Sequence, residues 1–283
     1  MAWLLPFILV LCSAGLHASW NLIVKGEDDK LFSGWLTVLT PSLLLSPVLL
    51  VTGFPPPEAW PILLGSAVIH TGYMIALTQA YVHGDLSVVY PVARGLAPIL
   101  VAVGAPLFLG EHLSPTAILG IVLVGCGIAW LGVSARRSSA SFSGLAWAVA
   151  TAVFIASYSI MDKVGVSRTN PVSYIIVLMG ANSMFMTPVV LWRRDAHHMA
   201  AVWRRRWGSA ILGGLLSITA YLLVLIAMRL TQVSYIAALR ESSVVLAALL
   251  GWRVLREPYG GRRILASAVV ALGLILLVFA MRG

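Results

Sequence analysis

Long apolar stretches separated by short polar or charged turns make up almost the whole chain. Ten of them are long enough to cross a bilayer, because about 20 residues rising 1.5 Å each span a hydrocarbon core of ~30 Å. They cover residues 3–24, 32–52, 60–82, 86–108, 114–133, 143–162, 172–192, 207–228, 233–252 and 263–281. No alternating ten-residue pattern recurs, so these stretches are expected to be helices and not barrel strands. The pattern predicts an all-α membrane protein with ten transmembrane helices.

Composition agrees with this prediction and excludes other classes. The chain has 283 residues, of which 60% are hydrophobic and 10% are charged, whereas a soluble protein has about 25% charged residues. The net charge of +9 does not indicate nucleic-acid binding, because the basic residues lie in short turns at helix ends without interleaved aromatic residues. Cys12 and Cys126 lack metal-ligand spacing and are expected to be buried thiols. We expect neither a metal nor a cofactor.

The second half of the chain repeats polar positions of the first half. The matched positions keep the same order at offsets of 138 to 148 residues: Ala18-Ser19-Trp20-Asn21 with Ala156-Ser157-Tyr158-Ser159, Tyr73 with Tyr221, and Arg94 with Arg240. A linker-like stretch at residues 134–139 separates the halves. We predict two five-helix repeats, residues 1–137 and residues 138–283. Because five is odd, the two repeats have opposite orientations, which is the inverted-repeat plan of secondary transporters.

Three charged residues lie in the interior of the expected helices, away from their ends. They are Arg94 in the stretch 86–108, and Arg240 with Glu241 in the stretch 233–252. An unpaired guanidinium in lipid costs at least ~2.5 kcal/mol, so each charge should face a water-filled cavity or a partner charge. Two interpretations remain open. Either the arginines bind a solute, or Glu241 neutralises them and holds the two halves together. If burial raises its pKa, Glu241 could also carry a coupling proton.

Other polar and aromatic residues are candidates for the lining of the same cavity. They are His17, Trp20, Asn21, His70, Tyr73, Tyr90, Tyr158, Ser159 and Tyr221. The alternative for the aromatic residues is packing within the bundle, and for the others it is hydrogen bonding between helices. The histidines could also relay protons. Glu111 is expected to cap a helix, whereas Asp162 and Lys163 are expected to be solvated at the membrane interface.

The turns predict the orientation of the chain. The odd-numbered turns hold thirteen lysines and arginines, and the opposite side holds four. Since cytoplasmic loops are enriched in these residues, both termini are expected outside an inner or plasma membrane.

Three motifs fall in order on the expected helices. They are His17-Ala18-Ser19-Trp20-Asn21, Tyr90-Pro91-Val92-Ala93-Arg94-Gly95 and Gly110-Glu111-His112-Leu113. Together they resemble the drug/metabolite transporter superfamily, in its EamA-type ten-helix branch. The first two also resemble a subgroup associated with phosphonate use. The resemblance implies a secondary transporter that works by alternating access, with a central cavity lined mainly by its first, third, fourth, sixth, eighth and ninth helices.

The predicted function is secondary transport of a small polar or anionic metabolite, such as an amino acid, a carboxylate or a phosphonate. Two arginines and two histidines against one acid favour an anion. No phosphate-binding loop appears, so a proton or sodium gradient, or the gradient of the solute itself, should drive transport. The alternatives are a membrane-embedded enzyme or lipid-handling protein that acts on a headgroup, and a purely structural subunit. The sequence does not indicate an oligomeric state.

Overall fold

The computed structural model describes residues 3–25, 29–133, 141–244 and 261–282. The regular elements within these ranges are all helices. Those of the first half are α1 (Leu4–Lys25), α2 (Lys30–Leu45), η1 (Ser46–Val48), α3 (Leu49–Thr52), η2 (Pro57–Ala59), α4 (Trp60–His83), α5 (Leu86–Leu109) and α6 (Pro115–Val133). Those of the second half are α7 (Phe142–Ser167), α8 (Pro171–Arg193), α9 (Ala196–Leu230), α10 (Val233–Leu239) and α12 (Gly261–Ala280).

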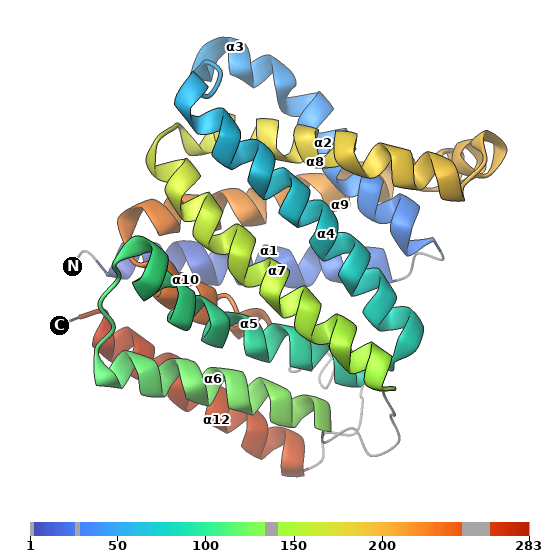
Figure 1. Ribbon diagram of the computed structural model, residues 1–283. Helices are drawn as coiled ribbons and strands as arrows, with labels where there is room; N and C mark the ends of the chain where they lie inside the picture. Colours follow the sequence, from blue (N-terminus) through green and yellow to red (C-terminus); the bar gives the residue numbers. More distant parts are fainter. Residues whose placement is uncertain (1–2, 26–28, 134–140, 245–260, 283) are drawn as a thin grey trace.

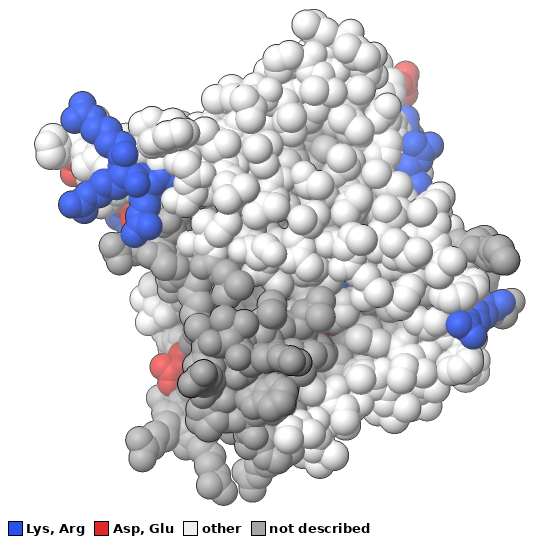
Figure 2. Space-filling view, turned by 180° about the vertical axis from the view of Figure 1, so that it is seen from behind, with Lys and Arg blue, Asp and Glu red and all other residues white. Residues whose placement is uncertain are grey.

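The helices have the length and surface of membrane spans. Six segments are long and apolar enough to cross a bilayer, and three shorter apolar helices accompany them. Large apolar side chains point outward, and Val51 and Trp192 are exposed by 88% and 83%. Figure 2 shows a broad uncharged band, with lysines and arginines at its two opposite edges. The prediction of an all-helical membrane protein is confirmed. The number ten remains a prediction, because the stretch expected at 233–252 is described only as far as residue 244.

Helices of the two halves pack against each other. The most extensive pairs are α4 with α7, α6 with α12, and α1 with α9, and α2 also packs against both α8 and α9. In Figure 1, α6 and α12 lie side by side along one edge of the bundle, and both chain ends lie on the same side. The close approach of α6 and α12 requires glycine, because a Cβ atom on Gly120 would meet the Gly273 carbonyl oxygen at 2.9 Å. The centre of the bundle therefore receives side chains from both halves.

The ninth expected helix is interrupted inside the membrane. Helix α10 ends at Leu239, and the next turns close by shorter i→i+3 bonds, from the Glu241 N–H to the Ala238 oxygen and from the Ser243 N–H to the Arg240 oxygen. The start of α10 is held by Glu111 of the first half, whose carboxylate accepts from the N–H of Val233 at 2.6 Å. The same carboxylate accepts from the N–H and hydroxyl of Ser234. The prediction that Glu111 caps a helix is thus confirmed.

The prediction for the cysteines was wrong. Cys12 on α1 and Cys126 on α6 are both exposed on the outside of the bundle. In a soluble protein an apolar stretch indicates burial, but in a bilayer the outward face of a helix is apolar as well. Hydropathy therefore does not distinguish a core position from a lipid-facing position.

Candidate functional site

Arg94 and Glu241 form a buried ion pair between the two halves. Arg94 lies on α5, Glu241 follows the end of α10, and the Arg94 Nη2 atom is 3.1 Å from the Glu241 Oε1 atom. Only 5% of Arg94 and 2% of Glu241 are exposed. The interruption after α10 places the carboxylate here, because the chain turns at this point instead of continuing as a straight helix. The partner charge that the sequence required for Arg94 is therefore supplied by Glu241.

Each member of this pair keeps one polar atom unused. Within the described part of the chain, the Arg94 Nε atom and the Glu241 Oε2 atom have no hydrogen-bond partner, although both are buried. A buried donor or acceptor without a partner costs about 1–3 kcal/mol, and more when the group is charged. The pair therefore leaves one donor and one acceptor unsatisfied within the described residues.

A small cavity lies beside the pair, between α5, α7 and the segment that follows α10. Its lining includes Arg94, Pro98, Ile155, Ser159, Arg240 and Glu241. In this conformation it has room for about one water molecule. The Arg240 guanidinium lies over the ring of Tyr221, 5.3 Å from its centre. Two guanidinium groups and one carboxylate give the cavity a net positive charge.

An aromatic cluster lies next to the cavity and joins α4, α7 and α9. The Tyr158 ring stacks on His70 with the ring centres 4.0 Å apart, and it meets Tyr73 and Tyr221 edge-on at 5.8 Å and 6.2 Å. The structure thus brings four of the predicted residues together. Tyr221 belongs to this cluster and also contacts Arg240, so the cluster and the cavity share a side chain.

The remaining predicted residues lie around these two groups. His17 and Trp20 on α1 pair with each other, since the Trp20 indole N–H donates to His17 Nδ1 at 3.1 Å. His17 and Tyr90 are both within electrostatic reach of Arg94 and Arg240. The side chain of Asn21 lies outside the described residues.

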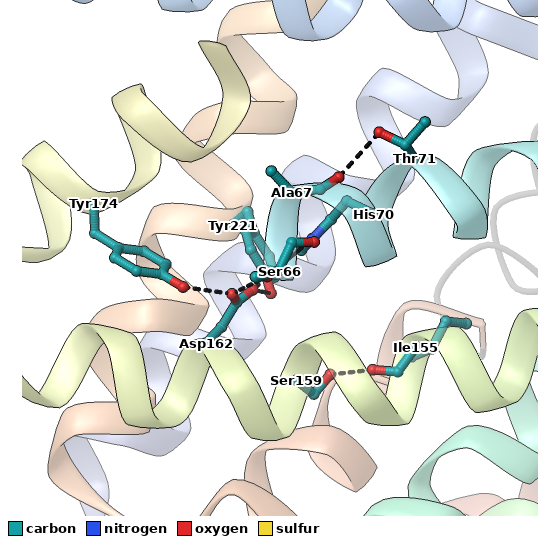
Figure 3. A network of polar contacts seen from close by, with 9 residues as sticks. All are labelled: Ser66, Ala67, His70, Thr71, Ile155, Ser159, Asp162, Tyr174 and Tyr221. Carbon is teal, nitrogen blue, oxygen red and sulfur yellow. Dashed lines mark hydrogen bonds and ion pairs between the residues drawn. The ribbon is translucent and has the colours of Figure 1, made fainter. Parts of the chain in front are cut away.

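A second buried acid is Asp162, which we expected to be solvated. The structure corrects this expectation, because Asp162 on α7 is completely buried. Its carboxylate accepts hydrogen bonds from the hydroxyls of Ser66, Tyr174 and Tyr221. Figure 3 shows these groups converging from α4, α8 and α9. His70 on α4 is close as well, with its Nε2 atom 3.9 Å from the Asp162 Oδ2 atom.

One signal in the sequence could have identified Asp162. It lies four residues after Tyr158 and three after Ser159, so all three share one face of the helix. The neighbouring Lys163 suggested a charged helix end. In the structure Lys163 is partly buried, and its ammonium donates to the carbonyl oxygens of Met228 and Thr231 at the end of α9. Asp162 and Lys163 therefore point in different directions, and each forms hydrogen bonds with its own set of partners.

Comparison with known proteins assigns the family. The model of the EamA-like transporter family matches the chain twice, over residues 2–133 and 142–279. The chain belongs to this family. A solved crystal structure is also similar to it, with a TM-score of 0.79 and 20% identity, over 99% of this chain and 97% of that one. An identity this low supports the fold alone. No curated protein matches.

The family assignment restricts what the site can do. An EamA-like transporter is a membrane protein of the drug/metabolite transporter superfamily, so the buried charges belong to a protein that moves small molecules. The two matched segments agree with a two-repeat layout. In this EamA-like transporter, Arg94 comes from the first segment and Glu241 from the second. The cavity beside them is therefore lined by residues of both matched segments.

Proposed function

We propose that this protein is a secondary transporter for small zwitterionic metabolites, with amino acids as the best-fitting class. The observation that carries the proposal is the pair of unused buried atoms beside the cavity, the Arg94 Nε donor and the Glu241 Oε2 acceptor. An amino acid offers a carboxylate to the first and an ammonium group to the second. Arg240 supplies a further positive charge for the carboxylate.

The ion pair itself favours a zwitterion over a simple anion. Arg94 is already neutralised by Glu241 at 3.1 Å, so Arg240 contributes the excess charge of the cavity. A carboxylate or phosphonate without an amine would leave Glu241 Oε2 without a donor, at the cost of an unmet buried acceptor. These anions are the second candidates, supported by the positive charge of the lining.

Transport in this proposal proceeds by alternating access. The cavity has room for about one water molecule, so a solute can enter only after helices of the two halves separate. Helices of different halves already form the main contacts of the bundle, and two inverted five-helix repeats would let the same contacts open toward either side. The lack of a nucleotide-binding motif in the sequence leaves a gradient as the energy source.

A thermal-shift panel on purified protein tests the substrate class. Glycine, L-alanine and L-serine should raise the unfolding midpoint, whereas propionate, methylphosphonate and ethylamine should raise it less, because each lacks one of the two charges. A ligand at 100 times its dissociation constant adds about 2.7 kcal/mol of stability. Equal shifts with propionate and methylphosphonate would assign the site to simple anions.

Matched variants test whether the cavity residues cause the shift of the unfolding midpoint. Arg240→Gln and Glu241→Gln should each abolish the shift by L-alanine, whereas Arg204→Gln should retain it, because Arg204 is exposed on α9 away from the cavity. Sealed proteoliposomes should then take up labelled L-alanine unaltered. Release of an altered product in detergent would instead indicate an enzyme, and a shift that survives both cavity variants would refute this site.

A further inference from the structure

The three hydroxyl groups around Asp162 come from both halves of the protein. Ser66 lies on α4 of the first half, whereas Tyr174 and Tyr221 lie on α8 and α9 of the second half. All three bonds require the hydroxyls to donate, because an ionised carboxylate only accepts. The ionised form of Asp162 thus connects α7 to three other helices at one point.

The orientation of His70 leaves a place for one proton. Its Nδ1 atom lies 3.0 Å from the Ser66 carbonyl oxygen, which only accepts, so Nδ1 carries a hydrogen. The neutral ring then has a lone pair on Nε2, the atom that lies 3.9 Å from Asp162 Oδ2. Two acceptors that face each other in a buried site attract a proton between them. The pair therefore has a defined position at which one proton is gained or lost.

Titratable and charged groups lie on each of the elements packed against α7. They include His70 and Tyr73 on α4, Tyr90 and Arg94 on α5, Tyr174 on α8, Tyr221 on α9, Arg240 and Glu241 after α10, and Tyr158 and Lys163 on α7 itself. Arg94 and Glu241 pair with each other, and Lys163 is bound to carbonyl groups. Of these groups, the His70 imidazole is the one whose lone pair lies 3.9 Å from the Asp162 carboxylate.

Tyr221 connects this acid to the solute cavity. Its hydroxyl donates to Asp162, and its ring lies under the Arg240 guanidinium at 5.3 Å. A neutral carboxyl group accepts hydrogen bonds more weakly than a carboxylate and uses one oxygen as a donor. A change at Asp162 therefore loosens Tyr221 and, through it, the position of Arg240.

We propose that Asp162, with His70, is the proton-binding site that couples solute transport to a proton gradient in this protein. The proposal rests on the proposed transport function, but it concerns residues outside the lining of the cavity. A proton that passes from the His70 Nε2 atom to the Asp162 carboxylate leaves the imidazole neutral and removes the charge that holds the three hydroxyls, so α4 separates from α8 and α9 and the two halves move apart. Deprotonation restores the bonds and closes the bundle at this point.

A measurement of proton binding that needs no transport tests the first step. Infrared spectra of the purified protein, recorded while the pH is stepped, should show a carboxylic acid band that Asp162→Asn removes. Tyr174→Phe should change the midpoint of this band, because one hydroxyl donor to the carboxylate is removed. A band that persists in Asp162→Asn, or a midpoint unchanged in Tyr174→Phe, overturns the proposal. The second variant retains the acid, so it remains informative if the first does not fold.

Flux measurements test the coupling. In proteoliposomes, an imposed pH gradient should drive wild-type accumulation of labelled L-alanine. In Asp162→Asn, this gradient-driven accumulation should be lost. Accumulation by Asp162→Asn equal to that of wild type would refute coupling, and so would a wild type driven only by a sodium gradient. If the wild type does not exchange alanine, the proposed substrate is wrong, and the infrared titration still decides whether Asp162 binds a proton.

Discussion

At the scale of single residues, the Arg94–Glu241 pair carries a large desolvation cost, because both charged side chains are buried. Removing two charges from water costs several kcal/mol per ion, and their mutual attraction recovers this only with good geometry and further hydrogen bonds. Here one bond of 3.1 Å is made, and two buried atoms have no partner within the described residues. A pair with unsatisfied buried atoms contributes little to the stability of the fold. It fits a site in which a ligand forms the missing hydrogen bonds.

Substitution of the pair should therefore be strongly non-additive. Glu241→Leu leaves Arg94 buried without its acid and should cost about 3–5 kcal/mol of unfolding free energy. Adding Arg94→Met to that variant should recover most of the loss, because no uncompensated charge of the pair remains. Thermal unfolding in detergent measures both, with Arg204→Met as a control at an exposed site. Additive losses in the double variant would show that the two residues do not act as a pair.

A glycine on α7 offers a second test at this scale. A Cβ atom on Gly165 would lie 2.5 to 2.7 Å from ring atoms and the hydroxyl of Tyr174, a side chain that is completely buried. Gly165→Ala should displace Tyr174 from Asp162 and cost on the order of 1–3 kcal/mol. Gly208→Ala is the matched control, because a Cβ atom there meets no atom within 4 Å. In a helix that control should be neutral or slightly stabilising. Equal unfolding midpoints for the two variants would contradict this packing.

At the scale of the helices, much of the fold could be predicted because membrane spans are apolar throughout. The sequence did not predict the bounds of a helix that continues beyond its apolar part. The span expected from residue 207 is part of α9, which begins at Ala196 and has 35 residues, roughly 52 Å. Asp195 caps this extension by accepting from the His198 N–H at 2.8 Å, and the arginines at 204–206 are good helix formers. Hydropathy alone does not detect such a polar extension.

The contact between α2, α8 and α9 outside the membrane predicts a pH dependence. Asp29 accepts from Arg194 Nη2 at 3.1 Å and contacts His198 Nε2 at 3.0 Å. Partial burial acts to raise the pKa of Asp29, but hydrogen bonds from Arg194, from the Phe32 N–H and from His198 outweigh it and hold the pKa below its usual value. The stabilisation is therefore complete above the unfolded-state pKa of about 3.9, and it is lost as the pH falls through the lower folded-state value.

Asp29→Asn should accordingly lower the unfolding midpoint at neutral pH, by an amount on the order of 1 kcal/mol. The difference from wild type should shrink below about pH 4, since the wild-type carboxylate becomes protonated there. Unfolding curves over a pH series measure this, with the exposed Glu58→Gln as a control. A difference that stays constant across the series would show that the charge of Asp29 does not contribute.

At the scale of the whole molecule, the candidate site could be predicted only in part. Arg94, Arg240, Glu241 and Ser159 were singled out from the sequence and do line one cavity. Intramembrane charge and the internal repeat point to such residues without knowledge of contacts. Asp162 was not identified in this way, because it lies at the end of its apolar stretch and its burial depends on Ser66, Tyr174 and Tyr221. Polar networks assembled by tertiary packing leave only weak local patterns.

The distribution of charge over the molecule predicts its orientation. Arginines gather where α8 ends and α9 begins; Arg193 and the arginines at 204–206 are exposed, and this group corresponds to the projecting blue corner in Figure 2. The opposite side carries fewer, among them the exposed Arg168. Because basic residues favour the cytoplasmic side, the arginine-rich end should face the cytoplasm and both termini should lie outside.

Labelling of single cysteines tests this orientation in intact cells. In a background with Cys12→Ser and Cys126→Ser, Arg168→Cys should react with a membrane-impermeant maleimide added outside. Arg204→Cys should react only after the cells are permeabilised. Both positions are exposed, so a difference in labelling reports the side of the membrane and not burial. The reverse pattern would place the termini inside, and the excess of arginines would then require another cause, such as contact with the anionic headgroups of lipids.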